Sequence, residues 1–418
     1  MRTVRPGRIR CSAVLRSRDP EARGGPPVAR ETSRQVQFVI KISKFCNLRC
    51  TYCYEFAELG QRERMSREQL RSMYTHMRDY YVKKDQEDGV RTHLHIVWHG
   101  GEPLMIDPEY YWRSLDDQRE IFGTSLKVSN FVQTNLTVLD DERIRLLRDG
   151  FDHVGVSVDL FSGLRVNIAG RNQQRNVVAN MERLRSEGVP FGCITVLTRK
   201  NLGRVKDTFS FYEKAGIGFR VLPLFDGAYE DQHVAYDITV PEIVSALNEM
   251  ADLWLESDTP VQVSPLDSHF QIVLRHLNPD APRVYFNQRE WLSVMVVNTP
   301  GDIYAYGDPY EDPEASLGNI FTTPLDELLS GPRFDASATA SEVRMAANCL
   351  NCKYFGACSG APIASNRDNV HTVVEGIAVC DVERTVLEHI ENRLRSSDVL
   401  DHDGRIRAAA APAVDPVS

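Results

Sequence analysis

Residues 37–53 read QFVIKISKFCNLRCTYC, an apolar run that leads into three closely spaced cysteines. Residues 37–43 are rich in β-branched and aromatic side chains and are typical of a buried strand. Five further runs of this kind follow, at 93–98, 128–134, 153–159, 190–198 and 218–224. Helical patterns separate the runs, and such a strand–helix alternation predicts parallel strands joined by right-handed crossovers.

The number of repeats limits the architecture. Six strand–helix units are fewer than the eight of a closed barrel. We therefore predict an α/β fold with an open, partial (β/α)6 TIM-like barrel, and keep a doubly wound sheet as the alternative. Ser66 and Gln69 have the spacing of a capping box at a helix start, whereas Gly150 and Gly188 suit left-handed residues at helix C-termini.

Composition over the 418 residues excludes several classes of protein. Hydrophobic residues make up 42% and charged residues 26%, as in an ordinary soluble globular protein. No run approaches the roughly 18 uncharged apolar residues that a membrane span needs. Residues 1–36 carry nine arginines and a net charge of +6, which leaves −15 for residues 37–418 out of the total of −9. An acidic body is a poor general nucleic-acid binder, so we expect neither a nucleic acid nor a membrane as partner.

Changes in composition divide the chain into regions. We predict a disordered basic arm, the barrel, a helical bridge, a small cysteine-rich C-terminal domain and a disordered tail, at 1–36, 37–230, 231–290, 291–400 and 401–418. Helical patterns near 241–257 and 267–277 form the bridge, and a hairpin pattern at about 292–306, turning at Gly301, opens the cysteine-rich domain. So few apolar residues lie between 345 and 380 that this segment needs a metal or another staple.

Seven of the nine cysteines fall into two groups, and Cys11 and Cys193 stand alone. The N-terminus lacks the continuous apolar core of a secretory signal, so we expect a cytoplasmic protein. In a reducing cytosol, grouped thiols bind metal or act in catalysis more often than they form disulfides. Cys193 lies within a predicted strand and is interpreted as a buried core residue.

The first group, Cys46, Cys50 and Cys53, has C-x3-C-x2-C spacing directly after the first predicted strand. Active sites of α/β barrels lie at the C-terminal ends of their strands, so this loop is on the chemical face. Three thiolates are one fewer than a closed structural site needs. A four-iron cluster held by three cysteines would leave one iron open, and the alternative is a zinc knuckle with a distant fourth ligand.

The cysteine loop, with the aromatic Tyr52 before its third cysteine, resembles the signature of radical S-adenosylmethionine (SAM) enzymes. The resemblance spans residues 37 to about 385. In that family the open iron of a [4Fe–4S] cluster chelates the amino and carboxylate groups of SAM, and one electron splits a carbon–sulfur bond to give a 5′-deoxyadenosyl radical. The sequence Gly100-Gly101-Glu102-Pro103 resembles the family's GGEP motif, which implies that these residues bind the SAM ammonium group.

The same resemblance assigns further SAM contacts. Ser157 and Arg171 would contact the ribose or the carboxylate, and Leu197 would contact the adenine through its backbone. Arg165 competes with Arg171 for this role. Each of these residues has a plain alternative as a solvated residue at a strand end.

The second group, Cys349, Cys352, Cys358 and Cys380, supplies four thiolates for zinc or for a [4Fe–4S] cluster, and spacing alone does not distinguish the two. The segment resembles a SPASM domain, whose full pattern holds two auxiliary clusters. Two positions that are cysteines in that pattern are Tyr306 and Pro362 here, and a third has no counterpart. The resemblance therefore implies one auxiliary [4Fe–4S] cluster instead of two.

The departure from the SPASM pattern also affects which residue could act as the general base. In related sulfatase-maturating enzymes an Asp just after the hairpin acts as the base. Gly307 is aligned with it here, and Asp308 follows one position late. We keep Asp308 as a candidate catalytic residue, although Asp next to Gly and Pro is more often a turn residue.

The function implied by the resemblance is hydrogen abstraction from a residue of a ribosomally made precursor peptide. We expect a crosslink, carbon–carbon or carbon–heteroatom, because the motif regions resemble maturases that form cyclophane or related macrocycles. A flavodoxin or ferredoxin would donate the electron. Two alternatives stay open: a SPASM-type dehydrogenase or epimerase of a small molecule, and a non-catalytic iron–sulfur or zinc-binding interaction protein.

Overall fold

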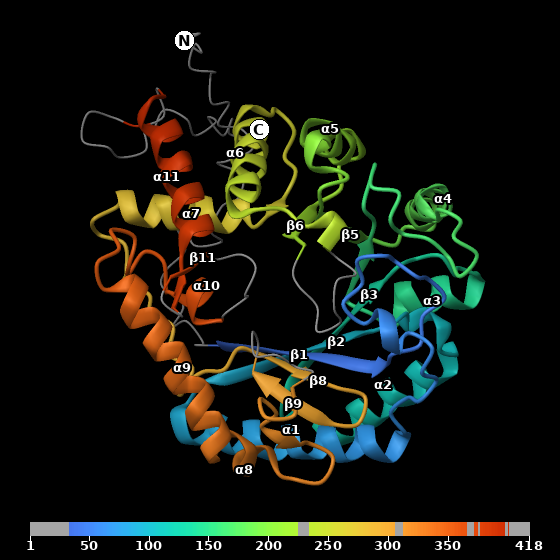
Figure 1. Ribbon diagram of the computed structural model, residues 1–418. Helices are drawn as coiled ribbons and strands as arrows, with labels where there is room; N and C mark the ends of the chain where they lie inside the picture. The colour runs from blue at the N-terminus through green and yellow to red at the C-terminus, as the bar shows by residue number, and fades with distance from the viewer. Residues whose placement is uncertain are drawn as a thin grey trace, which may run out of the picture.

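The computed structural model describes residues 33–224, 234–305, 312–365, 372–374, 377–397 and 400. Six parallel strands form its frame and follow one another in chain order (Figure 1): β1 (Ser33–Ser43), β2 (Arg91–Gly100), β3 (Lys127–Thr134), β4 (His153–Ser157), β5 (Phe191–Leu197) and β6 (Phe219–Pro223). This order confirms the predicted open barrel. It excludes a doubly wound sheet, in which the strand order reverses at a switch point.

Helices follow the first five strands and lie outside the sheet (Figure 1): α1 (Arg67–Asp88), α2 (Pro108–Phe122), α3 (Asp141–Asp149), α4 (Gln174–Ser186) and α5 (Val205–Ala215). Residues of β1 that face this layer, Phe38, Ile40 and Ile42, are almost completely buried. Trp98 of β2 contacts Tyr111 of α2 with ring centroids 5.3 Å apart. The hydrophobic core therefore lies between the sheet and its outer helices.

The inner face of the sheet is more open than the outer face. Inward-facing Val39, Val97, Gln133 and Ile194 are half-buried, while their chain neighbours on the outer face are buried. A closed barrel fills its interior with layers of side chains. Here the inner face stays accessible, and it surrounds the space in which a substrate would meet the ends of the strands.

The sheet continues beyond the six predicted strands on both sides. Its further members are β7 (Val263–Ser264), which pairs with β6, and a C-terminal set made of β8 (Val294–Val297), β9 (Asp302–Ala305) and β10 (Gly318–Asn319). β8 lies parallel to β1, with Val39 opposite Val296. The predicted hairpin is confirmed, and Gly301 in its turn has φ 102. The hairpin belongs to the same sheet as the barrel.

Helices and a short ribbon complete the C-terminal part: α6 (Val240–Glu256), α7 (Leu266–Leu277), α8 (Leu325–Ser330), α9 (Pro332–Cys349), α10 (Ala361–Ala364), β11 (Thr372–Val374), β12 (Ile377–Val379) and α11 (Asp381–Arg395). The first two confirm the predicted bridge helices, and α11 packs against both of them. Across the described ranges, no helix has the length and apolar character required to cross a bilayer.

Four local predictions had different outcomes. The Ser66–Gln69 capping box is confirmed, and Gly188 is left-handed with φ 70. Gly150 is not left-handed; its φ is −104. A Cβ there would lie 2.8 Å from the carbonyl oxygen of Leu146, so the position needs glycine for close packing. The expected arm boundary at residue 36 is also wrong, because β1 begins at Ser33.

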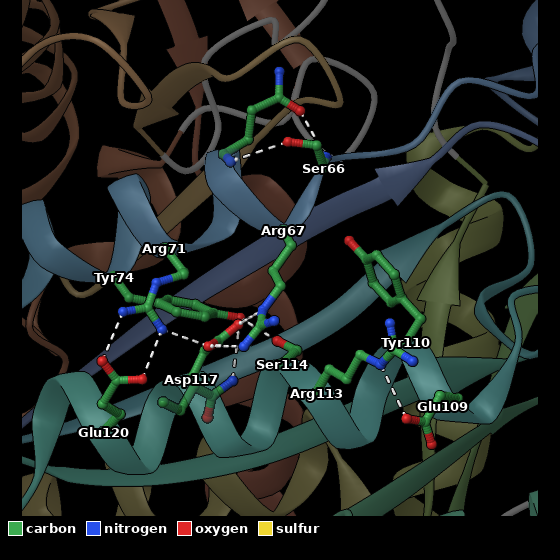
Figure 2. Close-up of polar contacts among 12 residues, drawn as sticks. Ser66, Arg67, Arg71, Tyr74, Glu109, Tyr110, Arg113, Ser114, Asp117 and Glu120 are labelled. Atoms are coloured by element: carbon green, nitrogen blue, oxygen red, sulfur yellow. Dashed lines mark hydrogen bonds and ion pairs between the residues drawn. The ribbon is translucent and has the colours of Figure 1, made fainter.

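A buried carboxylate joins α1 to α2. Asp117 of α2 accepts hydrogen bonds from Arg67 Nε at 2.7 Å and from Arg71 Nη1 at 2.5 Å, and Arg71 also pairs with Glu120 (Figure 2). The hydrogen bonds from Arg67 hold the pKa of Asp117 below its ordinary value. A carboxylate with two guanidinium partners fixes how α2 lies on α1.

We predict that Asp117→Asn lowers the free energy of unfolding by about 2 kcal/mol at pH 7, because it removes a charge-assisted acceptor from two arginines. The pKa of Asp117 is depressed, so its stabilisation is present above about pH 4 and is lost as the pH falls through the folded-state pKa. Urea denaturation of the chain at several pH values measures this. The control is Asp116→Asn at an exposed pair with Arg119; an equal loss in both variants would contradict the prediction.

Candidate active site

The first cysteine loop folds over the C-terminal end of β1. Cys46, Cys50 and Cys53 gather there with Leu48 and Leu59 in a small apolar cluster. Burial raises the pKa of Cys46 and Cys53 to about 12 and also raises that of Cys50. Thiols in this setting become thiolates only when a cation compensates their charge, as iron does.

The cysteine loop is held by the segment that follows β4. Arg49 N–H donates to the carbonyl of Val166 at 2.7 Å, and Leu48 forms a bridge with Asn167. Because these contacts are made by the backbone, the loop keeps its path whatever its side chains bind. The sequence gives no local signal for this pairing.

Tyr52 connects the loop to two strand ends. Its hydroxyl donates to the carboxylate of Asp159, which is buried after β4, and accepts from Arg165 Nη1 at 2.8 Å. Arg165 also donates to Asp159 at 3.3 Å, and Val196 N–H of β5 donates to the other carboxylate oxygen at 2.7 Å. Tyr52, the aromatic residue of the signature, is therefore part of a buried network that contains the carboxylate of Asp159 and the guanidinium of Arg165.

The two glycines at the end of β2 bring it against β1. Gly100 has φ 121, and a Cβ there would lie 2.1 Å from the carbonyl oxygen of Ser43. A Cβ at Gly101 would lie 2.4 Å from the carbonyl oxygens of Lys44 and Phe45. Close backbone approach is thus required here between two strand ends, and the segment approached leads directly into Cys46.

Glu102 links the end of β2 to the end of β3. Its buried carboxylate accepts from Thr134 Oγ1 at 2.6 Å, Asn135 N at 2.6 Å and Leu104 N at 2.9 Å. Burial raises the pKa of Glu102. The expected complementary charge for a SAM ammonium group is thus a carboxylate whose orientation is fixed by three protein donors.

Asn135, directly after β3, is a site residue that the sequence analysis did not single out. Its Nδ2 donates to Asn47 Oδ1 at 3.0 Å and to Cys46 Sγ at 3.7 Å. Leu48 N–H donates to the same sulfur at 3.4 Å. Glu102 is thus connected to the cysteine loop through Asn135, whose backbone N–H it accepts. Hydrogen-bond donors to a ligating sulfur tune a metal centre.

The other residues assigned by the resemblance differ in the hydrogen bonds that they make. Ser157 is half-buried and accepts from Gln133 Nε2 at 2.7 Å. The carbonyl of Leu197 already accepts Leu224 N–H at 2.9 Å. Asp308 lies outside the described residues.

The structure distinguishes the two competing arginines. Arg171 is exposed, whereas Arg165 is mostly buried beside Tyr52 and close enough to Cys50 to lower the pKa of that thiol after burial has raised it. The buried Nε of Arg165 has no hydrogen-bond partner within the described ranges. A buried guanidinium with a donor to spare fits an anionic group such as a carboxylate.

His99, at the end of β2, has a structural role. Its Nδ1 accepts the N–H of Gly100 at 2.7 Å, which leaves the proton of a neutral ring on Nε2. Burial, followed by the nearby Lys41, lowers the pKa of His99 to about 4. The ring is therefore neutral at physiological pH.

The second cysteine group surrounds one pocket. Cys349 ends α9, Cys352 and Cys358 lie in the turns after it, and Cys380 precedes α11; all four line the pocket together with Pro362 and apolar side chains. Asn348 Oδ1 accepts Cys380 N–H at 2.9 Å and so fixes the last cysteine relative to the first. Burial raises the pKa of Cys349, Cys358 and Cys380.

Both donor sets consist of thiols alone, which suit an iron–sulfur cluster as well as zinc. Among the residues that the structure describes, no three His, Cys, Asp or Glu side chains converge as one metal ion would require. A single zinc holds its ligands at about 2.0–2.3 Å from one centre. A four-iron cluster binds each thiolate through a different iron, so its cysteines need not converge on one centre.

Comparison with known proteins agrees with this geometry. Residues 40–212 match the family model of the Radical SAM superfamily. These residues are therefore a radical SAM domain, and the chain is a radical SAM enzyme. It is homologous to the serine-type anaerobic sulfatase-maturating enzyme of Bacteroides thetaiotaomicron, 25% identical over 76% of this chain and 80% of the relative. The cysteine-type enzyme of Clostridium perfringens is 24% identical over 76% of this chain and 86% of the relative.

Solved structures share the fold. The structure of anSMEcpe with AdoMet and the Cp18Cys peptide bound has a TM-score of 0.64 and 18% identity, over 86% of this chain and 97% of that one. Streptococcus suis SuiB bound to S-adenosylmethionine has a TM-score of 0.52 and 14% identity, over 81% and 77%. At these identities the likeness establishes the fold only.

We predict that Arg165→Met lowers the free energy of unfolding of the metal-free chain by about 3 kcal/mol, because it leaves Asp159 buried without its cationic partner. Arg171→Met, at the exposed competing position, changes it by less than about 0.5 kcal/mol. Urea denaturation measures both. Equal effects would contradict the placement of Arg165 in the buried network.

Gly101→Ala tests the close approach of β2 to β1. The new Cβ meets backbone oxygens that have no rotamer to change, so we expect a loss of about 2 kcal/mol and reduced iron uptake on anaerobic reconstitution. Gly203→Ala is the control, since nothing lies within 4 Å of its Cβ position. Full iron content and unchanged stability in Gly101→Ala would show that the two strand ends can separate freely.

Proposed function

We propose that this radical SAM enzyme modifies a ribosomally made precursor peptide and forms a crosslink in it. The observation that carries the proposal is the joining of the Cys46 loop to Glu102 and to the Tyr52–Asp159–Arg165 network at the open end of the barrel. A separate four-cysteine pocket in the same chain supports an oxidative outcome, which needs an electron acceptor. The sulfatase-maturating relatives, and SuiB solved with its precursor peptide SuiA, support a peptide as substrate.

Each group of residues has a role in this proposal. Cys46, Cys50 and Cys53 would hold a [4Fe–4S] cluster with one open iron, and the four C-terminal cysteines would hold an auxiliary cluster. Bound SAM and the first cluster would supply the 5′-deoxyadenosyl radical that abstracts hydrogen, and the auxiliary cluster would accept an electron. Gly100, Gly101 and Glu102 would position the SAM ammonium group.

The remaining SAM contacts come from later strands. Arg165, with its unpaired Nε, would bind the SAM carboxylate in preference to Arg171, and Ser157 and the Leu197 backbone would border the ribose and adenine. Asp308 remains the proposed base. A flavodoxin or ferredoxin is the proposed donor of the first electron.

Anaerobic co-expression with the small open reading frames that neighbour the gene, followed by mass analysis, tests the function. A crosslink removes two hydrogens from the peptide and suppresses backbone fragments between the joined residues. A loss of two hydrogens with normal fragmentation would instead indicate dehydrogenation, and an unchanged mass epimerisation. Modification of a small molecule with every peptide untouched would overturn the proposal.

Cysteine variants separate the two centres. We expect Cys50→Ala to abolish release of 5′-deoxyadenosine from SAM in the presence of dithionite. A double variant, Cys349→Ala with Cys352→Ala, should release the nucleoside yet form no product. The intact chain should bind about eight irons, as two cubanes require, and the double variant about four. Product formation by the double variant would refute an electron-accepting role for the second centre.

A further inference from the structure

The inner face of β6 carries an arginine, Arg220, that has no counter-ion among the residues described by the structure. Phe219 and Val221 are buried on the outer side, where Phe219 stacks on Tyr212 of α5 at 4.2 Å. Side chains alternate along a strand, so Arg220 projects from the inner face. In the sheet register Arg220 is opposite Ile194, which is opposite Ser157 at the end of β4. Arg220 is thus in the same row as a residue of the candidate active site.

The surroundings of Arg220 differ from those of an ordinary surface arginine. Its side chain is exposed, and it makes no hydrogen bond or ion pair in the part of the chain that the structure describes. Protein nevertheless surrounds it closely enough that burial lowers the pKa of Arg220. The guanidinium is thus partly desolvated, and among the described residues no carboxylate compensates its charge.

The nearest acidic group does not neutralise this charge. Asp267 at the start of α7 opposes the lowering of the Arg220 pKa, but its carboxylate accepts from Gln262 Nε2 at 3.1 Å and Ser268 N at 2.8 Å and makes no ion pair with the guanidinium. Within the described ranges, Arg220 therefore forms no ion pair with a carboxylate.

Two other cations near the ends of the strands, Lys41 and Arg165, are paired. Lys41 of β1 pairs with Glu55, and Arg165 pairs with Asp159. Arg165 also lies beside the cysteine loop, where SAM is expected, whereas Arg220 is on the far side of β5 from it. A carboxylate that reaches Arg220 would come from the second substrate, the peptide.

We propose that Arg220 is a substrate-recognition residue that binds a carboxylate of the peptide, either an Asp or Glu side chain or a free C-terminus. This inference rests on the proposed function. A guanidinium binds a carboxylate through two parallel N–H donors, which fixes orientation as well as position. Pairing also compensates the desolvation of Arg220, and it sets the distance between the peptide's acidic group and the residue that reacts at the strand ends.

Affinity selection with two synthetic heptapeptide libraries, one with free and one with amidated C-termini, tests the proposal. The reconstituted full chain with SAM is incubated with each library, and retained peptides are identified by mass spectrometry. We expect about tenfold enrichment of peptides bearing the preferred carboxylate over their amide counterparts, lost in Arg220→Gln and partly kept in Arg220→Lys. Selection of Asp or Glu from both libraries identifies a side chain, and preference for free acids alone identifies the C-terminus.

The control is Arg148→Gln, at an exposed arginine on α3 outside the barrel, which should keep the wild-type preference. Thermal denaturation of Arg220→Gln reports whether the variant folds. No carboxylate preference in the wild type, or an equal preference in Arg220→Gln, overturns the inference. Release of 5′-deoxyadenosine by the wild type is measured separately; its absence would refute the radical function, while the peptide selection would still report on Arg220.

Discussion

The buried carboxylate of Asp159 holds the active-site end of the barrel together. It accepts hydrogen bonds from Tyr52 in the cysteine loop, from Arg165 and from the backbone of Val196. A charge removed from water destabilises the fold strongly unless it is paired and hydrogen-bonded. All three segments must therefore stay at the carboxylate, and the cysteines are positioned by residues more than a hundred positions along the chain.

Both cysteine groups are built on one continuous frame. β1 leads into the first group and pairs on its other side with β8, at the start of the cysteine-rich part. Ser72 of α1 donates to the carbonyl of Phe321 at 2.6 Å, and Arg275 of α7 donates to the carbonyl of Ala357 at 3.0 Å. The small segment around the second group thus gains the core that it lacks by itself from the barrel and its bridge helices.

Features encoded by neighbouring residues were predicted well. The six barrel strands, the two bridge helices and the hairpin follow from local periodicity and turn residues. The gathering of the cysteines follows from spacing. Predictions failed or remained open where packing decides: a Cβ at Gly150 would meet Leu146 of its own helix and Leu115 of α2, and Gly100 and Gly101 lie against the end of β1.

The amino-acid sequence by itself determined the barrel and the two thiol sets, because periodicity and ligand spacing are properties of short segments. The class of chemistry followed from the resemblance of its motifs to those of a known family. Only the tertiary structure decided between Arg165 and Arg171 and brought Asn135 to the sulfur of Cys46. It also placed Arg220 on the inner face, where no ion-pair partner lies among the described residues. Six residues separate the two arginines in a loop without periodicity. Which of them is buried depends on Tyr52 and Asp159, whose approach results from folding of the whole sheet.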